Sequence, residues 1–192
     1  MNNNQKISQH IKFGLITVIL LIVGGCKWVF AQKDIYEVKK VSDGDTLSII
    51  DNNQSFTVRF ACMDAPEIAH TNAEKQSQKA VDKNQFAWGD KAKIRLQDLI
   101  KQGGDRVRLT VTDIDRYGRK VSEVRLPNNT LVQEVLIREG LAKVYKPYLK
   151  NCPSANIVQQ AETEAKQGKK GVWGDNKFVD PWEYRRTNKK ED

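Results

Sequence analysis

The sequence predicts an α+β fold in which a small closed barrel of five short antiparallel strands is combined with helices. Three segments of alternating apolar and polar residues come first, a helical segment follows, and two more strands and two more helices complete the pattern. Strands and helices do not alternate regularly, which argues against a doubly wound parallel sheet. At 192 residues, the chain has room for one domain with a substantial core.

The strands are marked by apolar residues at every second position and by turn-forming residues between them. Between residues 36 and 64 this pattern is interrupted at 43–44 (Asp-Gly) and at 51–53 (Asp-Asn-Asn). These interruptions predict three strands joined by tight turns. Two further strands, joined as a hairpin, are expected at 106–112 and 120–126.

Helical segments are expected in the middle and in the last third of the chain. Residues 68–85 are polar without an apolar period, so we expect a loop there that borders a substrate groove. Residues 86–100 place apolar side chains close to one helical face, and two glycines follow to end that helix. Thr130 and Gln133 form a capping-box pattern for the next helix, and a last helix is expected at 154–168.

The first 31 residues have the pattern of an export signal. Two lysines precede an apolar run at 13–24, which is too short for a comfortable membrane span. Val-Phe-Ala at 29–31 fits ordinary signal cleavage, and we favour this interpretation. Val-Gly-Gly-Cys at 23–26 approximates the site at which lipoproteins are cut and lipidated on Cys26, and an uncleaved membrane anchor is a further alternative. We therefore expect a secreted or periplasmic protein, with a membrane-anchored lipoprotein as the alternative.

The exported chain is basic and forms one domain. Without residues 1–31 it keeps 29 basic and 24 acidic residues, a net charge of +5. Such a surface attracts polyanions, of which nucleic acid is the usual one. We place the domain at 35–175 and a tail at 176–192, whose charged end at 185–192 is expected to be disordered. No heptad or conspicuous apolar patch indicates assembly, so a monomer is expected.

Two cysteines would enter an oxidising compartment after signal removal. Cys62 and Cys152 then either form a disulfide or remain free, with Cys62 a buried small hydrophobic side chain on a strand. The sequence leaves both alternatives open.

Three carboxylates lie beside turn-forming residues within a short stretch of chain. Asp45 and Asp64 are candidates to hold calcium, which prefers several oxygen ligands and tolerates irregular geometry. Pro66 restricts the backbone and sets Glu67 at a defined offset from Asp64, so Glu67 is available to act on a water molecule. The alternatives are an ordinary hairpin turn at Asp45 and a solvated corner at Asp64 and Glu67.

Two arginines complete a set of residues suited to phosphodiester hydrolysis. Arg59 alternates with Val58 and Phe60, which places it on the opposite face of its strand, and Arg119 closes the hairpin tip that begins at Asp115. A guanidinium can grip a phosphate with two donors. Each arginine alone is also compatible with a surface salt bridge. Their presence together with three carboxylates favours phosphoryl-transfer chemistry.

Aromatic and histidine residues refine this hypothesis. Tyr145, Lys146 and Tyr148 form a cluster in which a ring can stack on a base while the cation meets a phosphate, or simply pack at a rim. His70 is the only histidine outside the first 31 residues. Mechanisms that need a histidine pair within one chain are therefore excluded.

Several ordered segments together resemble the thermonuclease family, the staphylococcal-nuclease-like domain. The resemblance covers residues 35–175 and rests on the segments 41–46, 59–67, 115–119 and 131–144. It implies an oligonucleotide-binding (OB) barrel with three helices and calcium-dependent cleavage of DNA and RNA, endonucleolytic and exonucleolytic. Cleavage at the 5′ side of the phosphodiester would leave 3′-phosphate ends.

The resemblance also assigns roles to individual residues. Arg59, Glu67 and Arg119 match the family's catalytic positions, and Asp45 and Asp64 match its calcium ligands. Ala65 matches a position that ligates calcium through its backbone carbonyl. The spacing of the tyrosines differs from the best-known member, so the resemblance does not select the one that meets the terminal phosphate.

The sequence therefore predicts a calcium-dependent nuclease that acts on DNA and RNA. The main alternative is a non-catalytic nucleic-acid-binding barrel, a role that OB folds often perform. A surface lipoprotein that binds acidic polymers is a third alternative and would need a lipid anchor at Cys26.

Overall fold

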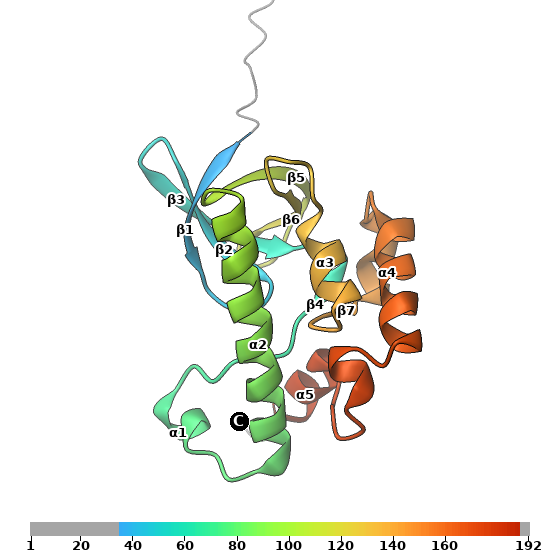
Figure 1. Ribbon diagram of the computed structural model, residues 1–192. Coiled ribbons are helices and arrows are strands. Elements are labelled where there is room, and N and C mark those ends of the chain that lie inside the picture. The colour runs from blue at the N-terminus through green and yellow to red at the C-terminus, as the bar shows by residue number, and fades with distance from the viewer. Residues whose placement is uncertain (1–34, 189–192) are drawn as a thin grey trace, which may run out of the picture. The chain divides into compact units, whose positions relative to one another are not determined.

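A computed structural model describes residues 35–188 of the protein. Its centre is a closed barrel of five strands in the spatial order β1-β2-β3-β6-β5 (Figure 1). The bounds of these strands are Tyr36–Val41 for β1, Thr46–Asp51 for β2, Gln54–Phe60 for β3, Arg106–Ile114 for β5 and Lys120–Arg125 for β6. The predicted fold class and the five-stranded barrel are confirmed.

The barrel interior is filled by the alternating apolar residues, such as Leu47, Ile49 and Val58, which are fully buried. The expectation that all strands run antiparallel is wrong, because β3 and β6 pair in parallel from Val58 opposite Lys120 onward. Parallel neighbours require a long crossover connection, and the chain between these two strands contains the longest helix of the described residues.

That helix, α2, spans Ala80–Gln102 and runs beside the barrel (Figure 1). Its residues Leu96, Leu99 and Ile100 are buried in the core. The predicted loop at 68–85 is therefore only partly correct, since α2 begins at Ala80 and a short helix, α1, spans Asn72–Lys75. The first turns of α2 carry buried polar side chains instead of apolar ones. Their partners come from distant segments, so a search for apolar periodicity misses this end of the helix.

A second helix, α3 (Val132–Arg138), lies beside the barrel, and α4 (Ala155–Gln167) packs against α3 (Figure 1). The predicted capping box at the start of α3 is wrong, because that helix has no side-chain cap. Gln133 is instead buried, where its amide accepts a hydrogen bond from Val124 N and donates one to Ser122 O of β6. The glutamine therefore binds α3 to the barrel.

Short elements complete the described chain. They are the paired two-residue strands β4 (Met63–Asp64) and β7 (Lys143–Val144), the 3₁₀ helices η1 (Lys146–Asn151) and η2 (Gly171–Gly174), and the helix α5 (Pro181–Asn188).

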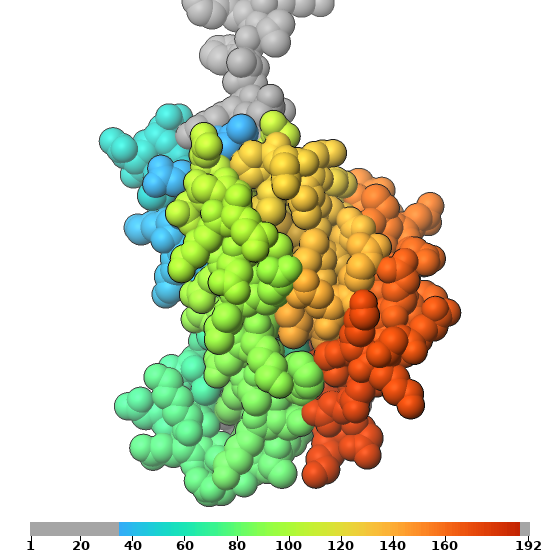
Figure 2. Space-filling model, viewed as in Figure 1, coloured from blue at the N-terminus to red at the C-terminus, as the bar shows by residue number. Residues whose placement is uncertain are grey.

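The predicted disorder of the last residues is wrong for the part that α5 occupies. Tyr184 is only 6% exposed, and its hydroxyl donates a 2.9 Å hydrogen bond to Asp82 of α2. The C-terminal segment lies against the lower half of α2 in Figure 2. Burial of the tyrosine ring thus orders a stretch whose composition is highly charged.

The expected export segment at 1–31 lies outside the described residues. Between residues 35 and 188, no helix combines the length and the apolar character that crossing a membrane requires.

Candidate active site

Two aspartates from different segments lie close together beside the barrel. Asp45 directly precedes β2, where the Asp43 side chain accepts a 3.0 Å hydrogen bond from Asp45 N. Asp64 lies on β4, which pairs with β7 at Lys143. Ala65 N donates a 2.8 Å hydrogen bond to Asp45 Oδ2 and so connects the two segments. The predicted role of the Ala65 carbonyl as a metal ligand stays a prediction.

Arg59 lies between these two aspartates. It pairs across the sheet with Thr46, and its side chain points away from the barrel interior that holds Val58. The Nη1 atom donates to Asp45 Oδ1 and the Nη2 atom donates to Asp64 Oδ1. The guanidinium of Arg59 therefore holds the two carboxylates close together.

Glu67 is held beside this pair by the close approach of α2. The backbone at Pro66 and Glu67 runs directly over Gly89, where a Cβ atom would lie 2.0 Å from the Glu67 carbonyl oxygen. The amide of the buried Gln85, in the orientation that satisfies both of its polar atoms, accepts a 3.2 Å hydrogen bond from Glu67 N. The helix thus sets the backbone of Glu67, and its carboxylate lines the cleft described below.

Burial changes the protonation behaviour of all three carboxylates. It raises the pKa of Asp45 to about 6, against the opposing effect of Arg59. It also raises the pKa of Asp64 and of Glu67, although the neighbouring arginines lower both. Asp64 and Glu67 line one cleft and Asp45 lies directly behind Arg59, and such a cluster of acids with raised pKa values is typical of a functional site.

The cleft beside these residues has a volume of about 820 Å³. Arg59, Asp64 and Glu67 line one wall, and Arg119 lines the cleft from the β5–β6 hairpin. Arg119 Nε donates a 2.6 Å hydrogen bond to Asp115, which also accepts the Arg119 backbone N–H at 3.0 Å. The hairpin tip therefore presents this arginine in a fixed orientation. All five of the carboxylates and arginines predicted from the sequence lie around or directly behind this cleft.

The tyrosines border the same cleft, but the neighbouring lysine does not. Tyr145 and Tyr148 both line it, with ring centroids 5.5 Å apart, and Tyr148 is 58% exposed. Lys146 instead lines an adjacent pocket together with Trp173 and Trp182. The two tyrosine rings therefore lie at the cleft, whereas Lys146, which was expected beside them, does not line it.

Comparison with known proteins shows the family to which a chain with this site belongs. The family model of staphylococcal nuclease homologues matches residues 57–175. The chain belongs to this nuclease family. A micrococcal nuclease of Shigella flexneri is 31% identical over 89% of this chain and 90% of its own length. An uncharacterized endonuclease of Haemophilus influenzae is 34% identical over 91% and 86%, respectively, and an endonuclease of Bacillus subtilis is 31% identical over 77% and 66%.

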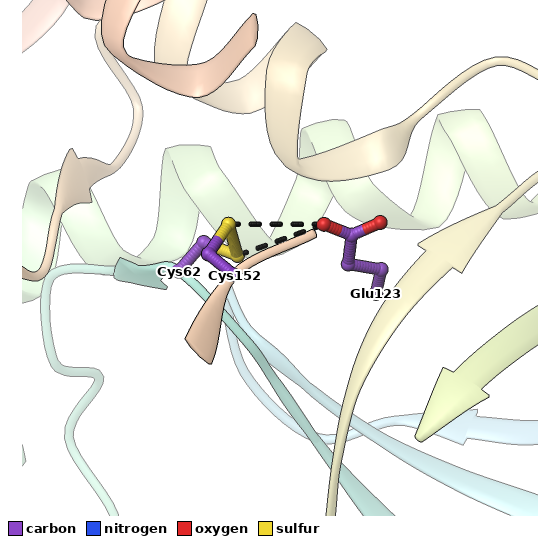
Figure 3. Close-up of side chains that lie close together, drawn as sticks. All are labelled: Cys62, Glu123 and Cys152. Carbon is purple, nitrogen blue, oxygen red and sulfur yellow. Dashed lines mark hydrogen bonds between the residues drawn. A yellow bond between two sulfur atoms is a disulfide. The ribbon is translucent and has the colours of Figure 1, made fainter. Parts of the chain in front are cut away.

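In this nuclease, Cys62 and Cys152 form a disulfide with a Cα–Cα distance of 5.5 Å. Glu123 lies beside the sulfurs, with its Oε1 atom 3.9 Å and 3.7 Å away (Figure 3). The carboxylate accepts hydrogen bonds from Ser154 N and Oγ at 2.6 and 2.9 Å. Because disulfide sulfurs are not thiolates, this cluster is not a metal site. The bond instead ties the chain before Asp64 to the chain after the tyrosines.

The nuclease site contains one residue that the sequence reasoning missed. Arg185, on α5, lines the cleft and forms ion pairs with Asp64 and Glu67. This arginine was missed because it belongs to a highly charged segment at the end of the chain, which was expected to be a disordered tail. The available signal was the group of aromatic residues just before it, which anchors the helix.

Proposed function

We propose that the protein is a calcium-dependent nuclease that hydrolyses DNA and RNA at the 5′ side of the phosphodiester and leaves 3′-phosphate ends. The observation that carries this proposal is the convergence of Asp64, Glu67, Arg59 and Arg119 on one cleft, with Asp45 bound to Arg59 behind it. Family membership supports nuclease activity in general, and the donor set supports the choice of metal.

Asp45 and Asp64 suit a hard divalent cation. Both are carboxylates, the hard oxygen ligands that such a cation prefers, and both are buried, with exposures of 2% and 1%. Calcium accepts carboxylate oxygens in irregular arrangements and fills its remaining positions with carbonyl oxygens and water. When bound there, calcium would supply positive charge that polarises the scissile phosphate.

The side chains of this site divide the reaction between them. Glu67 takes a proton from the attacking water, and burial raises its pKa, which makes its carboxylate a stronger base. The water oxygen bonds to phosphorus, the bond from phosphorus to the 5′ oxygen breaks, and that oxygen leaves with the bonding electron pair and takes a proton from solvent to become a 5′-hydroxyl. Arg59 and Arg119 donate hydrogen bonds to the phosphoryl oxygens as negative charge builds on them. Arg119 donates to Asp115 through Nε. Its two terminal nitrogens therefore stay available to bind the phosphate.

The cleft fits a single-stranded polynucleotide. Tyr145 and Tyr148 offer ring faces on which bases stack, and stacking tolerates every base and either sugar. Export, with cleavage after residue 31 or a lipid anchor at Cys26, would place this activity outside the cytoplasm. All the proposed catalytic residues come from one chain, so the proposal includes a monomer.

The test uses purified protein on single-stranded DNA and RNA, with calcium or with a calcium chelator. Wild type should cut both polymers only with calcium, and its products should carry 5′-hydroxyl and 3′-phosphate ends. Glu67→Gln should bind the polymers as wild type does while turnover falls by about 10²- to 10⁴-fold. Glu37→Gln, an exposed change on β1, is the matched control and should cut normally. Binding without cutting in calcium, magnesium or manganese would replace this proposal with a non-catalytic binding module.

A further inference from the structure

Arg185 is, after Arg59, a second cation that contacts the acids of the site. The proposed catalytic mechanism does not use it. Its Nη2 atom donates a 2.5 Å hydrogen bond to Asp64 Oδ2, and its Nη1 atom donates to Asp64 Oδ1 at 3.2 Å and to Glu67 Oε1. One guanidinium thus bridges a proposed metal ligand and the proposed general base. Its fork geometry makes this possible, because two nitrogens can each meet a different carboxylate.

This arginine is held in place by its own helix. Pro181 and Tyr184 of α5 are buried. The Tyr184 ring packs edge-on against Phe86 at a centroid distance of 6.1 Å, and its hydroxyl binds Asp82. On the other side of the helix, Trp182 packs on Tyr145 at 5.6 Å. The contact of Arg185 with the site therefore belongs to the folded core and is not a chance position of a loose chain end.

Asp64 receives a guanidinium at each of its oxygens. Arg59 binds Oδ1 and Arg185 binds Oδ2 most closely, while the carboxylate itself is only 1% exposed. A divalent cation bound by Asp64 needs the same lone pairs and meets the positive charge of Arg185 at close range. Like charges at such distances repel each other strongly enough to weaken metal binding.

We propose that Arg185 is a positioning residue that competes with the metal. It holds Asp64 and Glu67 together when no cation is bound, and it weakens the binding of a divalent cation at Asp64. This inference rests on the proposed use of calcium. Its consequence is a site that keeps its geometry and its charge balance without metal, at the cost of lower metal affinity.

Calcium binding measured by isothermal titration calorimetry tests this inference. Arg185→Gln should bind calcium at least about fivefold more tightly than wild type, because the competing charge is gone. Damage to the site would weaken binding, so tighter binding distinguishes competition from a merely structural role. Arg186→Gln is the matched control, since it removes the same charge from an exposed neighbour that pairs with Glu183. Its affinity should stay within about twofold of wild type, since an exposed charge is screened by solvent.

Thermal unfolding gives a second readout. Without calcium, Arg185→Gln should unfold at a lower temperature than Arg186→Gln, because Glu67 loses its arginine partner and Asp64 keeps only Arg59. Calcium should raise its unfolding temperature by more than it raises that of wild type. Arg185→Lys keeps the charge but has one nitrogen in place of the fork of two, so it should hold the two carboxylates less well, and its calcium affinity should lie between those of wild type and Arg185→Gln. This variant also decides the case if the glutamine variant does not fold.

The outcomes separate this inference from the proposed function. If wild type binds calcium and neither Arg185 variant binds it more tightly, the inference is overturned and the calcium-dependent nuclease stands. If the Arg186 control tightens as much as Arg185→Gln, general charge explains the effect and the inference is likewise overturned. If none of the proteins binds calcium, both the proposed cofactor and this inference fail.

Discussion

Replacing Gly89 with alanine should disable the site without adding any charge. This residue lies on α2 under the chain that carries Glu67. A Cβ atom there would lie 2.0 Å from the Glu67 carbonyl oxygen, 2.5 Å from its carbonyl carbon and 2.9 Å from the Pro66 oxygen. All three atoms are backbone, so no side-chain rotation relieves the overlap.

The size of the effect follows from these distances. Ordinary contact begins at 3.4 Å, so the helix and the Glu67 backbone must separate by about 1.4 Å. A misplacement of about 1 Å in a catalytic group can cost about 10²-fold in rate. We therefore expect kcat to fall by about 10²-fold, or about 2.7 kcal/mol. Overpacking costs about 1–3 kcal/mol of folding free energy, against which alanine gains about 1 kcal/mol of helix propensity over glycine.

The assay combines turnover on single-stranded DNA at saturating calcium with urea unfolding. Gly89→Ala should lose turnover far beyond what its modest loss of stability explains. Gln97→Ala, at an exposed position of the same helix, should leave both quantities unchanged. Full turnover in Gly89→Ala would refute the argument that this close approach positions Glu67.

Two further predictions concern the disulfide and the pH dependence of metal binding. The bond between Cys62 and Cys152 closes a loop across a sequence separation of 90, so the double variant to alanine should lose about 3–5 kcal/mol of unfolding free energy in urea; an unchanged value would contradict this. Burial raises the pKa of Asp45 to about 6, so below that pH a proton occupies the carboxylate and competes with calcium. Calcium affinity should therefore fall as the pH is lowered from 7.5 to 5, and equal affinities at the two values would disprove the role of Asp45.

Much of the site could be predicted from sequence because its signals are local. Asp45 follows a turn, Arg59 alternates with buried neighbours on a strand, and Glu67 comes directly after a proline. Turn chemistry and strand periodicity depend on a few adjacent residues, so they can be recognised in a linear pattern. Arg119 follows from the same reasoning, because its hairpin tip is a local feature.

Other features depended on contacts between distant segments. The parallel pairing of β3 with β6, the early start of α2 and the order of α5 all come from partners far away in the chain. Gln133 has the spacing of a cap, but a buried pair of hydrogen bonds to β6 gives it a different role. Local propensity is a weak prior that such tertiary contacts override.

By itself, the sequence determined the barrel, the group of acids and arginines, and the class of chemistry, because each depends on patterns among residues that are close together in the chain. Only the tertiary structure decided that Arg185 enters this group. Its contact with Asp64 spans more than a hundred residues and exists because Tyr184 is buried against α2. Burial of that aromatic ring stabilises a helix whose charged surface alone would favour disorder.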